Sequence, residues 1–246
     1  MRIMEFRSEV ISWSLVSTIW ISMMLISIEL IFGQIQSMAG WNKEQVLLLV
    51  SVQGLFVSCL WLFIFPSLLH FSELIRHGDL DFYLLKPIKP RIALSFSRFE
   101  YDQYPRILVL LILIKTFLDR LHVHITWITA GEAILLFFVG ILIFYNIFFL
   151  ISTVSFWSIR LFNLEDLFDS IIGVGKYPVD IFSKGIRFIF LYLVPVAFVA
   201  TFPVQIILGQ GNTSLILAGI ILVLVTFLLS QWFWTFALKR YQSASS

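Results

Sequence analysis

The 246-residue chain has few charged residues and a single cysteine. Charged residues make up 13% of the sequence, and the formal net charge is only +2. The chain therefore lacks the basic excess that is typical of a nucleic-acid-binding protein. Cys59 alone can form neither an intrachain disulfide nor a cysteine-based metal centre. Because Cys59 stands within an apolar run, we interpret it as a small buried hydrophobic residue.

Motifs for catalysis and for metal binding are also missing. The stretch GVGK (173–176) resembles part of a phosphate-binding loop, but Ser170 and Tyr177 stand where that loop needs glycine and serine or threonine. His122 and His124 lack a third ligand and an H-E-x-x-H pattern, so we interpret them as solvated loop residues. No nucleophile stands beside a recognisable base. We therefore expect no enzyme, and no ATP, cofactor or metal bound directly by this chain.

Hydrophobic residues are what the chain has in excess. They make up 59% of it, whereas a soluble domain has about 45–50%, and the mean hydropathy is +0.95. The first apolar run is too long for a cleavable signal peptide. A membrane-spanning helix needs about 20 apolar residues. We expect an all-α membrane protein with one transmembrane domain over residues 1–246, and six spans: Val10–Ile35, Val46–Leu69, Ile107–Leu118, Thr129–Trp157, Ile186–Ala200 and Leu215–Ala237.

The positions of the lysines and arginines decide whether the short third segment crosses the membrane. Cytoplasmic loops are enriched in these residues. Six crossings with the N-terminus inside place all but three of the 17 lysines and arginines in the cytoplasm. A five-span alternative distributes them more evenly between the two sides of the membrane. We predict six spans in the inner or plasma membrane, with both the N- and the C-terminus cytoplasmic. The predicted cytoplasmic set includes Lys176, Lys184 and Arg187.

Two prolines interrupt the apolar stretch that holds the predicted fifth span. Pro195 and Pro203 stand in and after it, and the following FPVQIILGQGN (202–212) is too short to cross again and too apolar for a solvated loop. Non-helical backbone at membrane depth must be buried in protein or line a wet cavity. We expect 203–209 to be re-entrant between spans five and six. The alternative is a longer, kinked fifth helix.

Two carboxylates lie within or near predicted spans. An ionisable side chain within a span is expensive and is a functional candidate by default. Glu29 lies inside the first predicted span, where it either lines a translocation path or makes a hydrogen bond that packs two helices. Glu132 lies near the outer end of the fourth span, and we interpret it as solvated at the headgroups.

A polar stretch, FSELIRHGDLDFYLLKPIKP (71–90), separates the second and third predicted spans. Gly78 suits a helix end, Asp79 suits the cap of a new helix, and Pro87 and Pro90 stop it. The sequence therefore predicts a short, capped, amphipathic cytoplasmic helix. Such a helix lies on the membrane or in a partner's groove, and the balance of acidic and basic residues disfavours the lipid surface. Its apolar face consists of Leu80, Phe82, Leu84 and Leu85.

Three stretches resemble one protein family. IRHGDLDFYLLKP (75–87) is similar to the I-R-x-G-x-L-D-x-x-L-L-x-P signature of ABC type-2 transporter permeases, the six-span membrane subunits of ABC exporters. KYPVDIFSKGIRFIFLYLVPVAFVATFP (176–203) resembles the Y-P segment and fifth span of that family, and ALKRYQSASS (237–246) resembles its C-terminal ending. One departure is the short stretch before the first span, residues 1–9, where family members carry a longer amphipathic segment.

The resemblance implies a function, partners and a coupling site. It implies an exporter in which this chain pairs with an identical or homologous permease, and in which two ATP-binding cassette subunits hold ATP and Mg²⁺. Membrane lipid surrounds the pair. In such permeases the loop between spans two and three enters a groove on the ATPase. By residue match, the ATPase-coupling residues here are Glu73, Arg76, Gly78, Asp79, Leu80, Asp81, Leu84, Leu85, Lys86 and Pro87.

Three other functions compete with this interpretation. An ion-gradient-driven secondary transporter would show paired intramembrane charges or inverted repeats, and Glu29 is its lone candidate. A non-transporting membrane assembly subunit would show no substrate-dependent stimulation of an ATPase. A membrane enzyme is disfavoured because nucleophile and metal patterns are missing.

Overall fold

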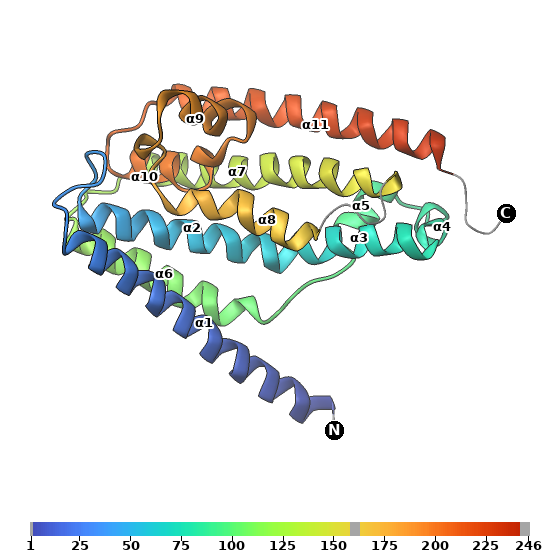
Figure 1. The fold of residues 1–246 in the computed structure, drawn as a ribbon, viewed down its shortest axis with the longest axis horizontal. Coiled ribbons are helices and arrows are strands. Elements are labelled where there is room, and N and C mark those ends of the chain that lie inside the picture. Colours follow the sequence, from blue (N-terminus) through green and yellow to red (C-terminus); the bar gives the residue numbers. More distant parts are fainter. Residues whose placement is uncertain (1, 158–162, 242–246) are drawn as a thin grey trace.

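The computed structural model describes residues 2–157 and 163–241, which form an all-helical bundle without a β-strand (Figure 1). Arg160 and residues 242–246, which the sequence predictions included, lie outside the described residues. The α-helices are α1 (Arg2–Phe32), α2 (Lys43–Phe63), α3 (Phe65–His77), α4 (Leu80–Leu84), α5 (Pro90–Ser95), α6 (Gln103–Arg120), α7 (Trp127–Thr153), α8 (Leu164–Gly173), α9 (Lys184–Phe188), α10 (Thr201–Ile207) and α11 (Ser214–Arg240).

Three helices of the described part are long and apolar enough to cross a membrane. They are α2, α7 extended by the 3-10 turn Val154–Phe156, and α11. They correspond to the predicted second, fourth and sixth spans. The predicted first and third spans lie on α1 and α6, and the apolar part of α1, Val16–Phe32, is shorter than these three. The prediction of an all-α protein with membrane-spanning helices is confirmed, whereas the six-span count stays a prediction.

Side-chain caps fix where α2 and α7 begin. The backbone N–H of Gln45 donates to Asn42 Oδ1 at 2.9 Å, and the backbone N–H of Asn42 donates to Gln45 Oε1 at 3.0 Å. This reciprocal arrangement satisfies two donors that a helix start leaves free. The first residue of α2 is therefore Lys43. Thr126 and Thr129 make the equivalent pair of bonds at the start of α7.

A proline divides the predicted second span. Pro66 has no N–H and its ring clashes with the carbonyl four residues earlier, so α2 ends at Phe63 and α3 begins at Phe65. The carbonyl freed by Pro66 is that of Leu62, and it accepts the backbone N–H of Glu100 at 3.3 Å. The break therefore ties the second span to the chain segment that leads into α6.

Phenylalanine rings fill the centre of the bundle. Phe65 of α3, Phe148 of α7 and Phe168 of α8 are fully buried. The Phe168 ring lies 4.8 Å from Phe65 and 4.2 Å from Phe148, measured between ring centroids. Such aromatic contacts contribute beyond the area that they bury. They hold α8 between α2–α3 and α7, as Figure 1 shows.

The segment from Leu164 to Ile181 runs along α3 and α2 in the opposite direction. It begins beside α3, where Leu164 and Glu165 line a cavity together with Ser72 and Arg76. The next contact is the Phe65–Phe168 stack described above. The segment thus begins at the end of the bundle where α3 finishes.

The same segment finishes at the opposite end of the bundle. Gln53 in the middle of α2 donates from Nε2 to the carbonyl of Ile172 at 3.4 Å. Trp41, in the loop before α2, donates from Nε1 to Asp180 Oδ2 at 3.2 Å. The contacts move steadily from α3 to the start of α2. Residues 164–181 therefore extend over the whole length of the bundle.

The predicted fifth span, Ile186–Ala200, is not one continuous helix, which corrects the sequence prediction. The structure divides it into the end of α9, a π-helical turn Ile189–Leu193 and a 3-10 turn Val196–Phe198, and α10 begins directly after it at Thr201. The break falls at Pro195, which cannot donate to the preceding turn. The segment folds back onto α7 and α11. The carbonyl oxygen of Phe198 would lie only 2.7 Å from a Cβ placed on Gly140 of α7, so these two backbones touch.

The placement of two basic residues, Lys184 and Arg187, also differs from the prediction. The sequence placed Lys176, Lys184 and Arg187 with the cytoplasmic loops. In the structure Arg187 pairs with Asp180 at 2.7 Å, and Asp180 bonds to Trp41 in the loop between α1 and α2. Arg187 thus lies, with Lys184 of the same short helix α9, at the end of the bundle that the prediction assigned to the outside. The apolar run 186–200 is divided in the structure, whereas the more polar residues 164–181 extend along the bundle.

Candidate functional site

Gly78 ends α3 in the way the sequence predicted. Its φ is +77°, a left-handed conformation that glycine adopts without strain. The backbone N–H of Asp79 donates to the carbonyl of Leu74 at 3.0 Å, and that of Gly78 donates to the carbonyl of Ile75 at 3.4 Å. These two bonds form a Schellman motif, which satisfies the last carbonyls of the helix. The chain can therefore reverse sharply into α4.

The predicted side-chain cap by Asp79 is absent, which is a second correction. Asp79 stands directly before α4, but its backbone is helical and its side chain makes no capping bond. A capping residue normally has an extended backbone, which directs its oxygen at the following N–H groups. The Schellman turn already fixes this backbone, so α4 needs no such cap. The helix is a single turn, Leu80–Leu84.

The apolar residues of α4 divide between the core and the surface. Leu80 is fully buried and holds the turn against the bundle. Phe82 is 69% exposed and Leu85 is 83% exposed. Lys86 lies next to them, with Nζ 3.8 Å from the centre of the Tyr83 ring. We call Phe82, Leu85 and Lys86 the α4 surface.

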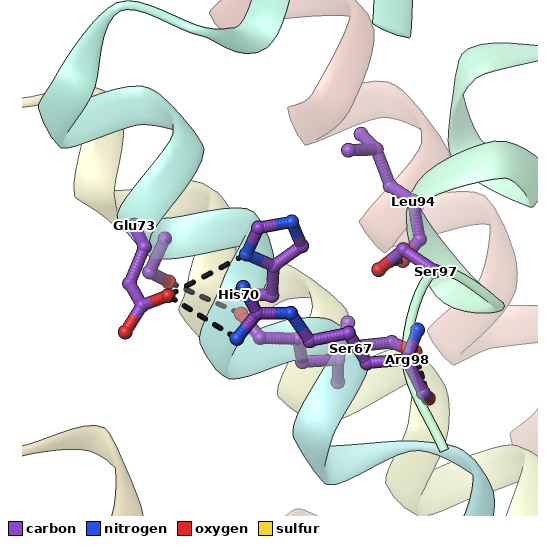
Figure 2. A network of polar contacts seen from close by, with 8 residues as sticks. Ser67, His70, Glu73, Leu94, Ser97 and Arg98 are labelled. Carbon is purple, nitrogen blue, oxygen red and sulfur yellow. Dashed lines mark hydrogen bonds and ion pairs between the residues drawn. The ribbon is translucent and has the colours of Figure 1, made fainter. Parts of the chain in front are cut away.

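A small polar network joins α3 to the chain segment before α6 (Figure 2). Glu73 Oε2 lies 3.4 Å from His70 Nδ1 and 3.6 Å from a terminal nitrogen of Arg98. Ser67 donates from Oγ to the carbonyl of Arg98 at 2.9 Å and accepts the backbone N–H of Arg98 at 3.1 Å. Exposed ion pairs contribute little to stability. The buried serine bonds therefore do more to fix the chain before α6 onto α3.

The end of α11 lies beside α4. Burial raises the pKa of the Tyr241 phenol, and the neighbouring Asp81 carboxylate raises it further. In Figure 1 the final turn of α11 and α4 lie toward the same end of the bundle. Asp81, one of the predicted coupling residues, thus lies beside Tyr241, the residue that directly follows α11.

The remaining predicted coupling residues surround the same turn. Glu73 and Arg76 line a cavity of about 340 Å³ between α3, the end of α7 and the start of α8. Leu84 is partly buried, and Pro87 follows the α4 surface in the chain. The structure brings the whole predicted set together at one end of the bundle. Its contact with an ATPase stays a prediction.

A second cavity, of about 520 Å³, lies between α1, α2, α6 and the segment 164–177. Its walls are largely apolar, and three charged side chains line it: Arg106, Asp169 and Lys176. Arg106 Nε is buried there without a hydrogen-bond partner. The sequence reasoning missed these three residues as a group because they come from separate elements. A search for charges between the predicted fourth and fifth spans would have found Asp169 and Lys176.

Glu29 does not line that cavity. Lys43 Nζ lies 3.1 Å from Glu29 Oε2, and the two side chains are 39% and 54% exposed. The pair joins the end of α1 to the start of α2, and a role of Glu29 in a translocation path stays a prediction. Glu132 accepts a hydrogen bond from Thr213 Oγ1 at 3.4 Å on the surface. Among the described residues, no group of three or more histidines, cysteines or carboxylates could hold a metal ion.

Comparison with known proteins identifies one relationship. A family model described as ABC-2 family transporter protein matches residues 18–245, which is nearly the whole chain. Comparisons with curated proteins and with solved structures gave no match.

Proposed function

Because the chain belongs to the ABC-2 family of transporter proteins, we propose that it is the permease subunit of an ATP-driven ABC exporter in the inner or plasma membrane. Members of the family are membrane components of transporters, so no catalytic site is expected on this chain. ATP and Mg²⁺ bind to two separate ATP-binding cassette subunits. A second permease, identical or homologous, completes the path.

The proposed topology has six crossings, of which residues 164–181 form the fifth. The ten residues of α8 span about 15 Å at 1.5 Å per residue. The eight residues 174–181, largely 3-10 turns, add about 16 Å at 2.0 Å per residue. The sum of about 31 Å matches a hydrocarbon core of about 30 Å. Residues 184–207 then form a re-entrant unit in the outer half, and Figure 1 places the start of α1, the end of α11 and α4 toward the same end.

The observation that carries the proposal is the α4 surface. Two large apolar side chains, Phe82 and Leu85, stand exposed on a one-turn helix that Gly78 and Leu80 hold rigidly at the end of α3. An apolar surface of this kind is typical of a protein interaction site. We assign it to the ATPase groove, so that closure of the two ATPases moves α4 and switches the path from inward to outward access.

The charged cavity supports a path along the segment 164–177. Ionisable groups at membrane depth face water or protein and not lipid. Asp169 and Lys176 are exposed in the single chain, at a depth where α2 is fully within its apolar span. We assign this face to the water-filled path between the two permeases.

Affinity purification tests the proposal. The chain carries a C-terminal tag, native membranes are solubilised in mild detergent, and co-purifying proteins are identified. We expect an ATP-binding cassette subunit with the wild type, and its loss with Asp81→Lys. The control is Asp119→Lys, which makes the same charge change on an exposed residue at the C-terminal end of α6, away from α4. Absence of any ATPase, also after cross-linking, would favour the gradient-driven transporter or the assembly subunit.

A further inference from the structure

Arg91 is a buried cation in the loop that carries the α4 surface. It is the second residue of α5, and only 8% of it is exposed. Among the described residues, no carboxylate lies within ion-pair distance of it. Burial of a charge is strongly unfavourable unless hydrogen bonds replace its water. No local sequence pattern indicates this burial, because Arg91 stands in a polar loop among other basic residues.

Neutral oxygens from two long helices replace that water. Arg91 Nε donates to Tyr145 Oη at 3.2 Å. One terminal nitrogen donates to Asn146 Oδ1 at 2.8 Å and to Ser230 Oγ at 2.9 Å, and the other donates to Gln231 Oε1 at 3.0 Å. Tyr145 and Asn146 belong to α7, and Ser230 and Gln231 belong to α11. A single side chain thus joins α5 to both helices.

Aromatic faces supply the remaining compensation of the charge. The guanidinium carbon lies 4.5 Å from the centre of the Phe149 ring and 4.9 Å from that of Phe227. Arginine is suited to such a position because its planar fork makes several hydrogen bonds while it stacks on rings. A lysine ammonium would keep the charge but could not reach all four oxygens in this geometry.

The connection from Arg91 back to the α4 surface is short and stiff. Residues 85–89 separate α4 from α5, and Pro87 and Pro90 each hold φ near −65°. Ser95 anchors the other end of α5, with its Oγ 2.7 Å from Tyr145 Oη and donating to the carbonyl of Arg91 at 2.7 Å. A displacement of α4 therefore reaches α5 directly.

We propose that Arg91 is the positioning residue that transmits movement of the α4 surface to α7 and α11. The inference rests on the proposed function, since it needs an ATPase that moves α4. The hydrogen bonds of Arg91, together with the Ser95–Tyr145 bond, connect the cytoplasmic loop to the helix pair whose outer halves pack against the re-entrant unit. Without them, the ATPase still docks and hydrolyses ATP, but the outer half of the bundle no longer responds.

The test measures docking, hydrolysis and movement separately in the full complex. Spin labels are placed on two exposed residues, Ile112 of α6 and Leu217 of α11, in a Cys59→Ser background. We expect ATP to change the distance between the labels in the wild type. In Arg91→Lys, recovery of the ATPase and its rate of hydrolysis stay at the wild-type level, and most of the distance change is lost.

Two milder variants keep the proposal falsifiable if Arg91→Lys fails to fold. Tyr145→Phe removes one hydroxyl of the network, and Ser230→Ala removes another, without a change in charge. We expect each to reduce the distance change while hydrolysis is retained. The matched control, Tyr104→Phe, removes an exposed hydroxyl from α6 and leaves all three readouts unchanged.

The outcomes separate this inference from the proposed function. A normal distance change in Arg91→Lys and in Tyr145→Phe would overturn the role of Arg91 alone. A parallel fall of ATPase recovery, hydrolysis and movement would also overturn it, because a purely structural role predicts that result. Failure of the wild type to recover any ATPase would overturn the proposed function, and the inference with it.

Discussion

Replacement of Gly140 by alanine tests how the segment after Lys184 folds back onto α7. A Cβ at Gly140 would lie 2.7 Å from the carbonyl oxygen of Phe198 and 3.0 Å from Cε2 of Phe56. The first neighbour is backbone, so the chain segment that carries Phe198 must shift to make room. Gly131, one of the first residues of the same helix, has no atom within 4 Å of its Cβ position. It is therefore the matched control.

The expected difference between the two variants follows from two opposing effects. Alanine in place of glycine stabilises a helix interior by up to about 1 kcal/mol, and this gain is common to both variants. Overpacking at Gly140 costs about 1–3 kcal/mol, and Gly131→Ala avoids it. Gly140→Ala should therefore be the less stable variant by about 1–3 kcal/mol. For a chain of this size, each kcal/mol lowers Tm by about 2–4 °C.

Thermal unfolding in one detergent, followed by tryptophan fluorescence, measures this difference. We expect Gly131→Ala to unfold at or slightly above the wild-type temperature, and Gly140→Ala to unfold several degrees below it. Equal unfolding temperatures for the two variants would refute the close approach of Phe198 to α7. The assignment of residues 184–207 to a re-entrant unit would then lose its packing basis.

Three further predictions concern ionisable residues and topology. Burial and neighbouring carboxylates raise the pKa of Glu100. Because its ionised form is destabilising, the stability of the protein falls as pH rises through the folded-state pKa. Glu100→Gln should therefore raise Tm at pH 7 but not below about pH 4. A wild-type Tm that rises over that pH range relative to the variant would contradict this. Lys184→Cys in a Cys59→Ser background should react with an impermeant maleimide on intact cells, and reaction only after permeabilisation would return Lys184 to the cytoplasm. Glu29→Gln breaks an exposed ion pair and should change the free energy of unfolding by no more than about 1 kcal/mol; a larger loss in denaturant unfolding would show that the carboxylate has other partners.

The elements that the sequence predicts well are those with a strong local signal. The long apolar runs predict α2, α7 and α11, and the Asn42–Gln45 pair predicts the start of α2. Gly78 predicts the left-handed end of α3 because few other residues adopt that backbone conformation. Each of these signals lies within a few residues of the feature that it specifies.

The proposed fifth crossing, residues 164–181, has no such local signal. Residues 164–181 include Glu165, Asp166, Asp169 and Lys176, so their hydropathy resembles that of a loop. They extend along the bundle because Phe168 and Ile172 are buried against neighbouring helices. The more apolar residues 186–200 follow the hydropathy rule but are divided at Pro195. Contacts with distant helices thus override the sequence pattern in both places.

In the candidate site, too, some features follow from the local sequence and others from contacts with distant residues. The turn at Gly78 and the apolar residues of α4 follow from residues 71–90 alone. The burial of Arg91 does not, because its partners stand 54 to 140 residues away in the chain. No local pattern distinguishes such an arginine from a solvated one. The charged cavity is likewise assembled from separate elements.

Photo-cross-linking from Leu85 tests the central claim most directly. A photoreactive amino acid replaces Leu85, whose side chain is 83% exposed at the tip of the α4 surface, and the complex is irradiated in living cells. The same amino acid at Ile128, an exposed residue at the opposite end of the bundle, is the control. The account predicts a cross-link from Leu85 to an ATP-binding cassette subunit and none to that subunit from Ile128. A cross-link to the ATPase from Ile128 alone, or none from Leu85 in membranes that contain the ATPase, would contradict it.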